Sequence, residues 1–252
     1  TAGGAGGEII QLTDEAMAQI PDTADYFVEA RIRPRQNSTT ANKQLYFTAR
    51  YDSANNWYGG GLNLQNSSSS TRVEIAISTD GSINRPVQAS TPLLLGEKDG
   101  TDGVWYRVRF DLVGDTLTVY LDGEEMGSIS DTTFTAKGLI GMFTNNRSFE
   151  MDDFKVGDPS EKPVQLTLDY KDTEWNATTT TDPLIVYVTA VQNDGITDDT
   201  FTVTSSDESV VSVAIDGPNV TLTPAAAGSA TVTFTSGSDP TLVRSVEVLV
   251  TE

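Results

Sequence analysis

The sequence contains no cysteine and no histidine. Without cysteine the chain has no disulfide framework and no thiolate zinc site. Without histidine it lacks the commonest general base and the commonest transition-metal ligand. Basic residues are also scarce, because 16 Lys and Arg stand against 36 Asp and Glu and give a formal net charge of −20. Nucleic acids and anionic membranes require a basic surface, so we exclude both as partners.

Long apolar runs are missing as well, and no segment approaches the roughly 20 residues that span a bilayer. The chain begins with TAGGAGGE instead of an initiator methionine. We therefore expect it to be a piece of a longer secreted polypeptide. The strong acidity fits a protein that must stay soluble outside a cell.

The sequence is instead rich in short alternating segments, which predict an all-β protein. YFVEARIRP, KQLYFTARYD and YGGGLNLQ, from Tyr26 to Gln65, are expected to form adjacent antiparallel strands with one buried face. Further strands are expected near residues 72–77, 104–114, 116–122, 138–146 and 148–158. Alternation places these side chains of the first three strands inside: Tyr26, Val28, Ala30, Ile32, Leu45, Phe47, Ala49, Tyr51, Tyr58, Leu62 and Leu64. The one helix expected is short, capped by Thr13 and ended by Pro21.

Composition changes near Asp158, where DPSEKP predicts a short stiff linker. Residues 159–252 hold only 3 Lys and Arg against 14 Asp and Glu, and Thr and Val dominate there. We predict a first domain at residues 1–158, a linker at 159–163 and a second domain at 164–252.

Arginine on the polar side of the strands is the sharpest functional signal. If the strands pair as expected, six arginines share one face with the acids Glu29, Glu74 and Asp111: Arg31, Arg33, Arg50, Arg72, Arg107 and Arg109. Arg presents a planar fork that matches a carboxylate in two hydrogen bonds, so such a row suits a polymer of uronic acids. In the alternative interpretation these arginines only pair with the three acids across the strands.

Aromatic and amide side chains could complete a sugar site. Tyr46, Trp57, Tyr58 and Trp105 are candidate platforms for the apolar faces of sugar rings, while Asn63 and Gln65 could bond hydroxyl groups. Trp57 could equally be a lid over the core.

Residues 22–158 resemble the concanavalin A-like jelly-roll family, in the branch used as carbohydrate-binding modules. The resemblance rests on FVEARIRP, NKQLYFTARYDSANNWYGGGLN, VWYRVRFDLVGDTLTVYLDG and GLIGMFTNNRSFEMDDFKVGD, in that order. Similar modules accompany secreted bacterial polysaccharide-degrading enzymes, including pectate lyases. Family members usually begin with a further N-terminal strand. We expect that strand to be missing here or replaced by the helical segment, because TAGGAGGEIIQ is a poor substitute.

The resemblance also implies a structural calcium site at Asp152 and Asp153, with a solvated acidic strand end as the alternative. Glucanases of the fold use a close pair of Glu, and lyases of similar fold use His and Tyr. The Glu motif and His are both absent, and Glu29 and Glu74 are flanked by Arg that would keep them ionised. We therefore expect no catalytic residues and no enzyme activity.

Residues 164–252 resemble bacterial immunoglobulin-like domains through FTVTSSDESVVSVAIDGPNVTLTPAAAGSATVTFTSGS. The resemblance implies a smaller β-sandwich that serves as a spacer. The whole chain is thus predicted to be a non-catalytic module that targets a secreted enzyme, through a catalytic domain of the same polypeptide, to an acidic polysaccharide. Pectic homogalacturonan is the first choice. The alternative is a fragment of a cell-surface adhesin that binds a neutral or host glycan.

Overall fold

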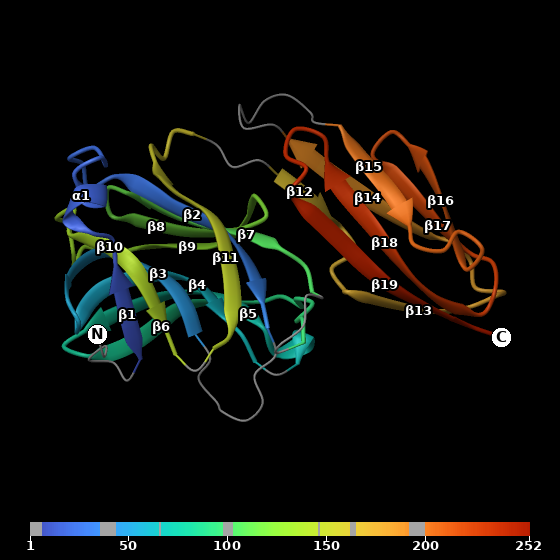
Figure 1. Cartoon of the computed structure of the whole chain (residues 1–252), viewed down its shortest axis with the longest axis horizontal. Helices are drawn as coiled ribbons and strands as arrows, with labels where there is room; N and C mark the ends of the chain where they lie inside the picture. Colours follow the sequence, from blue (N-terminus) through green and yellow to red (C-terminus); the bar gives the residue numbers. More distant parts are fainter. Residues whose placement is uncertain are drawn as a thin grey trace. The chain divides into compact units, whose positions relative to one another are not determined.

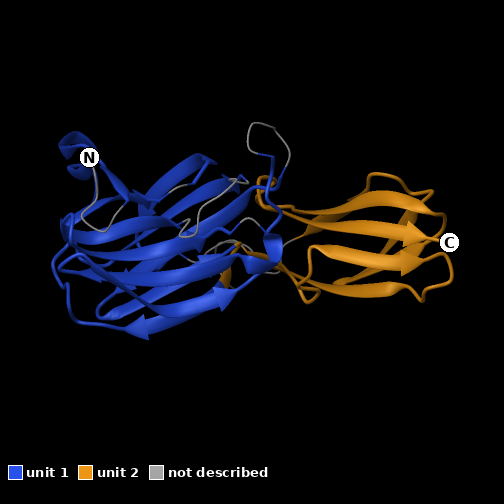
Figure 2. Ribbon diagram, turned by 90° about the horizontal axis from the view of Figure 1, so that it is seen from below, with its two compact units in different colours: residues 1–121, 125–161 blue, residues 122–124, 162–252 orange. Residues whose placement is uncertain are grey.

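The structure, a computed structural model, describes residues 7–35, 44–65, 67–97, 103–145, 147–161, 165–191 and 200–252. The chain divides into two compact units, residues 1–121 with 125–161 and residues 122–124 with 162–252 (Figure 2). Residues 162 and 163 of the predicted linker lie outside the described part. Both units are built of strands, so the all-β prediction is confirmed.

The first unit is a sandwich of two sheets (Figure 1). Sheet A has six strands in the order β1-β10-β3-β4-β5-β6, and sheet B has five in the order β11-β2-β7-β8-β9. The strands of sheet A are β1 (Glu8–Gln11), β3 (Gln44–Ser53), β4 (Asn56–Asn63), β5 (Arg72–Thr79), β6 (Ser82–Ser90) and β10 (Leu139–Thr144). Those of sheet B are β2 (Tyr26–Pro34), β7 (Tyr106–Val113), β8 (Thr116–Leu121), β9 (Glu124–Ser130) and β11 (Phe149–Gly157).

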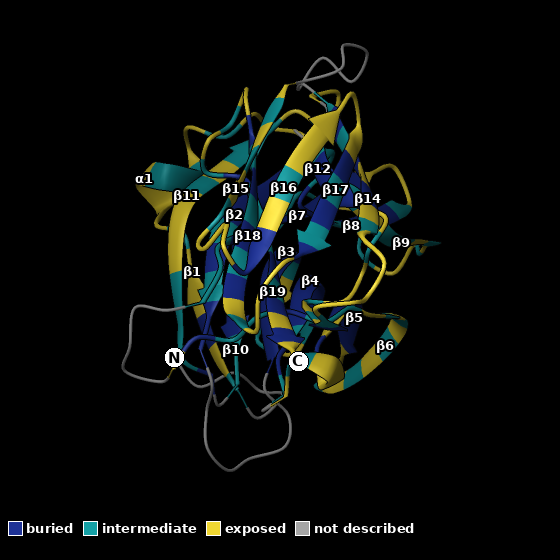
Figure 3. Cartoon of the chain, turned by 90° about the vertical axis from the view of Figure 1, so that its right-hand side faces the viewer, coloured by how far each residue is buried: buried dark blue, intermediate teal, exposed yellow. Residues whose placement is uncertain are grey.

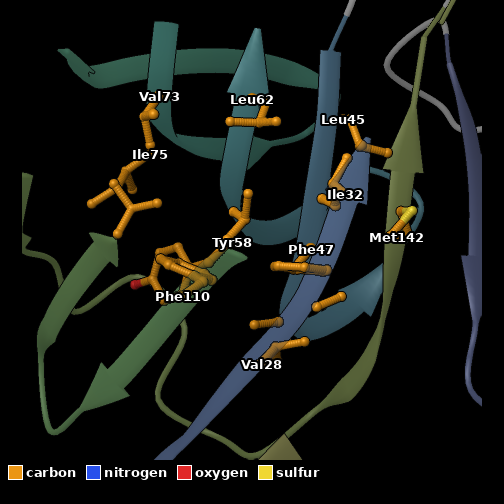
Figure 4. Close-up of a cluster of buried hydrophobic side chains, with 14 of the residues drawn as sticks. Val28, Ile32, Leu45, Phe47, Tyr58, Leu62, Val73, Ile75, Phe110 and Met142 are labelled. Atoms are coloured by element: carbon orange, nitrogen blue, oxygen red, sulfur yellow. The ribbon is translucent and has the colours of Figure 1, made fainter. Parts of the chain in front are cut away.

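The core lies between sheets A and B and contains the apolar faces that alternation predicts (Figure 4). Val28 and Phe110 come from sheet B, and Phe47, Leu62 and Ile75 come from sheet A; each is at most 1% exposed. Tyr51 is an exception among the residues expected inside. It follows a register shift in β3 and packs against a second cluster on the other face of sheet A.

The pairing of β2 corrects one prediction. The segment YFVEARIRP does not lie beside β3, because it pairs with β7 on one side and β11 on the other. Only β3 and β4 are neighbours among the three segments predicted to be adjacent. The consequence is that the polar side of β2 and the polar side of β3 point away from each other on opposite faces of the sandwich.

The N-terminal segment gives one correction and one confirmation. Glu8–Gln11 forms β1, which pairs with β10 at the edge of sheet A, so the expectation that this strand is missing or replaced is wrong. The helix α1 (Asp14–Met17) begins after Thr13, whose hydroxyl accepts a hydrogen bond from the backbone nitrogen of Ala16 at 3.3 Å. A one-turn 3-10 helix, η1 (Ser68–Ser70), precedes β5. No helix in the described ranges is long and apolar enough to cross a membrane.

Edge strand β6 ends the hydrogen-bonded order of sheet A opposite β1. Exposed and half-buried residues alternate along all of it, as Figure 3 shows. Its register against β5 shifts between Ile75 and Ile77, next to Pro86. The side chains of β6 therefore border both the core and solvent.

The second unit has two four-stranded sheets, β12-β14-β17-β16 and β13-β19-β18-β15. Its strands are β12 (Gln165–Leu168), β13 (Glu174–Thr178), β14 (Leu184–Val191), β15 (Phe201–Ser205), β16 (Val211–Asp216), β17 (Asn219–Pro224), β18 (Gly228–Ser236) and β19 (Val243–Thr251). Only β13 and β19 pair in parallel among the described strand pairs of this unit. Its separate core is centred on Val186, Leu222, Val232, Phe234 and Val246.

Candidate functional site

The outer face of sheet B carries four of the predicted arginines, two on β7 and two on β2. On β7, Arg107 donates from Nη1 to Glu29 at 2.9 Å. Arg109 forms two bonds to the carboxylate of Asp111, at 2.6 Å from Nε and 3.0 Å from Nη2. Both β7 arginines are therefore held by acids of the same sheet.

The two β2 arginines are held by β11. Arg31 donates from Nε to Asp153 at 2.7 Å and from Nη2 to Asp152 at 3.0 Å. Arg33 forms an ion pair with Glu150. The guanidinium carbons of Arg31 and Arg33 also lie 5.1 and 5.0 Å from the centre of the Trp105 ring, within cation–π range. Trp105 on this face is thus a partner of arginines.

The prediction that six arginines share one face is wrong, for two structural reasons. Arg50 and Arg72 belong to sheet A, because β2 pairs with β7 and β11 instead of β3. In addition, β11 places further acids on the outer face of sheet B. The four predicted arginines on that face, together with Arg35 directly after β2, meet five acids. The alternative interpretation of cross-strand ion pairs therefore fits this face better, with these acids: Glu29, Asp111, Glu150, Asp152 and Asp153.

Arg50 is a structural residue. Its backbone has a positive φ of 43°, and its side chain is 1% exposed. The guanidinium donates to the carbonyl oxygens of Ala24, Phe134 and Gly114, at 3.0 Å for the first two and 2.7 Å for the last. Because it is enclosed by these loops, Arg50 cannot contact a ligand, and its place in the predicted site is corrected.

Aromatic residues on the outer face of sheet A form a second small core. Tyr46, Trp57 and Phe143 are each 0% exposed. The ring of Phe143 lies 5.9 Å from that of Tyr46 and 5.1 Å from that of Trp57. The expectation that Tyr46 and Trp57 are exposed stacking platforms is therefore wrong, and Trp57 fits its alternative role as a lid. Tyr58 points to the main core, where its hydroxyl bonds Asp131.

A buried acid organises the polar part of this outer face. Glu74, on β5, is 0% exposed and accepts hydrogen bonds from the Tyr46 hydroxyl and, at 3.1 Å, from Asn63 Nδ2. Arg85 Nε lies 3.4 Å from the same carboxylate and donates to the Tyr46 oxygen at 3.2 Å. Burial first, and then the neighbouring Glu74 carboxylate, raise the pKa of Tyr46. Tyr46 therefore stays neutral and keeps its proton on this bond.

Two arginines on this face have donors without a partner in the contacts of the described residues. The Arg85 side chain is 28% exposed, and its two terminal nitrogens have no partner among the described residues. Arg72 is exposed and donates to Gln88 Oε1 at 3.0 Å, while Gln88 Nε2 donates to the backbone oxygen of Arg85 at 3.1 Å. Gln65 Nε2 donates to Asn63 Oδ1 at 2.6 Å. We call these five residues the sheet A arginine surface: Asn63, Gln65, Arg72, Arg85 and Gln88.

Alternation along the strands predicted Asn63, Gln65 and Arg72 as candidates, but it did not predict Arg85 and Gln88. Both lie in SINRPVQAS, where Pro86 and the register shift against β5 interrupt simple alternation. The available signal was the polar run itself, because Arg85 and Gln88 occur in a segment that must pair with the strand RVEIAIST across the turn at Asp80 and Gly81.

Glu29 and Glu74 lie in different sheets, on opposite outer faces. They therefore do not form the close carboxylate pair that a retaining glycosidase requires, about 5–5.5 Å apart. Each is engaged instead with its own arginine.

The contacts of Asp152 and Asp153 are with an arginine. A register shift after Asp152 brings both carboxylates to Arg31, so a cation there would meet a guanidinium. Within the residues that the structure describes, no group of three or more acidic, His or Cys side chains could hold a metal ion. Calcium needs six to eight oxygen ligands. The calcium site stays a prediction without support from these contacts.

Comparison with solved structures finds distant similarity to several proteins. The carbohydrate-binding module CBM66 from Bacillus subtilis is 17% identical with a TM-score of 0.41, and the match covers 53% of this chain and 75% of that one. Domain 4 of the arabinanase AbnA from Geobacillus stearothermophilus, solved with arabinotriose, is 15% identical with a TM-score of 0.36, covering 60% and 66%. The Caenorhabditis elegans galectin LEC-6 is 10% identical with a TM-score of 0.38, covering 60% and 90%.

Among curated proteins no relative matches the sequence. A family model described as the concanavalin A-like lectin/glucanases superfamily matches residues 4–158, which is more than half of the chain. This match agrees with the two-sheet antiparallel sandwich of the first unit and with the jelly-roll prediction. The chain belongs to the concanavalin A-like lectin/glucanase superfamily.

Proposed function

We propose that the first unit is a non-catalytic carbohydrate-binding module that directs a secreted polysaccharide-degrading enzyme to an acidic polysaccharide, with pectic homogalacturonan as first choice. Membership of a lectin-containing superfamily supports sugar binding. The second unit serves as an immunoglobulin-like spacer toward a catalytic domain of the same polypeptide. This role suits its two four-stranded sheets and its own core.

The proposal of an acidic ligand rests on the hydrogen bonds of Arg85. Its Nε is directed by Tyr46 and Glu74, so the planar group is oriented before any ligand arrives. No described residue accepts a hydrogen bond from the two terminal nitrogens of Arg85, so they can donate to a ligand. An arginine fork binds a carboxylate with two parallel hydrogen bonds. Arg72 adds a second cation on the neighbouring strand, and the amides of Gln65 and Gln88 can bond hydroxyl groups.

The whole chain carries a net charge of −20 and repels a polyanion at long range. Binding must therefore rest on short contacts, and moderate salt should speed association by screening that repulsion. Activity of the chain alone is not expected, since the two candidate glutamates lie on opposite faces.

The test compares Arg85→Ala, Arg72→Ala and Arg31→Ala on polygalacturonate, on fully methyl-esterified pectin and on a neutral β-glucan. A hydrogen bond to a charged group contributes about 1.5–3 kcal/mol, so losing Arg85 should weaken binding to polygalacturonate roughly ten-fold or more. Arg31→Ala is the matched control, because Arg31 already pairs with Asp152 and Asp153. Its affinity should stay within about two-fold of the parent.

Arg72→Ala guards against a folding artefact, because Arg72 does not contact Glu74 in the described contacts. It should reduce affinity while the melting temperature stays unchanged. Equal retention of esterified and de-esterified pectin by all variants would exclude the carboxylate-reading surface. Tight binding to the neutral glucan alone would favour the adhesin alternative.

A further inference from the structure

Arg147 is a buried arginine that the sugar site does not use. It is 9% exposed, and its three guanidinium nitrogens, Nε, Nη1 and Nη2, have no hydrogen-bond partner in the described part of the chain. The hydroxyl of Thr144, three positions earlier, is likewise buried and without a partner there. Buried polar groups are nearly always hydrogen-bonded, and buried charges are nearly always paired. The described part of the chain therefore leaves this charge and this hydroxyl group without the partners that buried polar groups normally have.

The backbone around Arg147 is held in place on both sides. Arg147 lies between the end of β10 in sheet A and the start of β11 in sheet B, so it lies where the chain crosses one end of the sandwich. Asn145 donates from its backbone nitrogen to Gln44 O at 2.9 Å, and Ser148 accepts from the backbone nitrogen of Arg35 at 3.2 Å. The crossing is thus tied to the start of β3 and to the end of β2. A guanidinium on such a support is pre-positioned for a ligand.

The chemistry of the group selects the ligand class. Arg147 stays charged at neutral pH, because burial lowers its pKa only to about 10. A planar fork with all its donors open matches an oxyanion in two parallel hydrogen bonds, whereas chloride satisfies only part of it. The group must also be compact, because so little of the side chain reaches solvent.

We propose that Arg147 anchors an anion-binding site at this end of the first unit, specific for a compact oxyanion such as a carboxylate or a sulfate group. Arg147 is not one of the five residues of the sheet A arginine surface, which belong to β4, β5 and β6 and the residues next to them. It does not depend on the proposed function. Its failure would leave the Arg85 test untouched.

The experiment measures thermal unfolding of the first unit within the full chain, in sodium chloride and in sodium sulfate at matched ionic strength, and again with sodium galacturonate. The parent protein is compared with Arg147→Met, Arg147→Lys and the control Arg31→Met. A ligand at ten times its Kd should raise the melting temperature by about 3–6 °C for a domain of this size. Arg31→Met should keep this rise, Arg147→Lys part of it, and Arg147→Met none.

The direction in which Arg147→Met changes the melting temperature in the absence of an oxyanion is the more decisive measurement. In chloride alone, Arg147→Met should melt at or above the parent temperature, because the substitution removes an unpaired buried charge. A response to galacturonate at lower concentration than to sulfate would identify a uronate as the source, and the reverse order would identify a free inorganic anion. Two results together would contradict the proposal: a lower melting temperature for Arg147→Met than for the parent in every buffer, and an oxyanion-induced rise in the parent no larger than that in the variant. Arg147 would then have a partner within the protein.

Discussion

The two outer faces of the first unit use arginine in opposite ways. On sheet B, five arginines among the described residues meet five acids, and the guanidinium groups are held in ion pairs or against the Trp105 ring. On sheet A, the buried acid Glu74 lies against Arg85 Nε, and the two terminal nitrogens of Arg85 have no partner among the described residues. The face with more arginine is therefore the one whose guanidinium groups are already engaged by acids.

The difference teaches that unpaired guanidinium donors are a better indicator of a binding surface than the number of arginines. An arginine that already forms two bonds to a carboxylate must lose them before it can bind another. An arginine fixed through Nε alone keeps its fork available and loses little freedom on binding. The comparison also separates two kinds of polar contact, those of the buried Glu74 and those of the exposed acids of β11, whose contributions to stability should differ.

The largest expected effect is on the buried network. Glu74→Ala leaves the Tyr46 hydroxyl and Asn63 without their acceptor at a position that is 0% exposed. We expect a loss of about 3 kcal/mol in the free energy of unfolding, measured by urea denaturation. Asp152→Ala on sheet B is the matched control, because its side chain is 61% exposed. Its loss should be below about 1 kcal/mol. Equal losses would show that the two networks do not differ as described.

An intermediate loss of stability is expected at alkaline pH, because high pH deprotonates the tyrosines and leaves the ion pairs of sheet B charged. Burial raises the pKa of Tyr26 to about 12, while Arg50 opposes the shift. Since the folded value lies above the unfolded value of about 10, stability is fully present below pH 10 and is lost as pH rises through about 12. The loss from Tyr26 is about 2–3 kcal/mol over this window.

The measurement combines tyrosinate absorbance with denaturation at each pH. Tyr46→Phe should show a smaller alkaline loss than the parent, because the raised pKa of Tyr46 adds to the same window. Stability that declines below pH 9 equally in both proteins would contradict the assignment to buried tyrosines.

The smallest effect concerns the exposed ion pair of Arg31 and Asp152. A double-mutant cycle with Arg31→Met and Asp152→Asn should give a coupling of about 0.5 kcal/mol at low salt, because one partner is largely solvated. At about 1 M salt the Debye length falls to about 3 Å and the coupling should approach zero. A coupling that survives high salt would mean that the sheet B network is as well shielded as that of Glu74.

Alternation predicted the buried side chains well and the polar partners poorly. Val28, Phe47 and Leu62 lie in the core because a strand must put every second residue on the same side. The same pattern says nothing about which strand lies alongside, so β2 was placed beside β3 when it pairs with β7 and β11. That single error moved Arg50 and Arg72 onto the wrong face.

Local departures from ideal strands explain the remaining misses. Arg50 has a positive φ, which turns its side chain into the loops instead of outward. The register shift after Asp152 puts two successive acids on Arg31, where alternation predicts opposite faces. Arg85 lies beside Pro86 and beside the register shift between β5 and β6. Its orientation depends on the carboxylate of Glu74, which belongs to another strand. These features depend on tertiary contacts that no local pattern contains.

The edges of sheet A have a consequence for self-association. An open edge strand offers unpaired backbone groups to a second copy of the chain, which is a common route to aggregation. At one edge β1 is only four residues long. At the other, β6 contains Pro86, which has no backbone N–H to donate, and Arg85, which carries a charge beside it. The two positions that break the regularity of β6 therefore also make it a poor template for another strand.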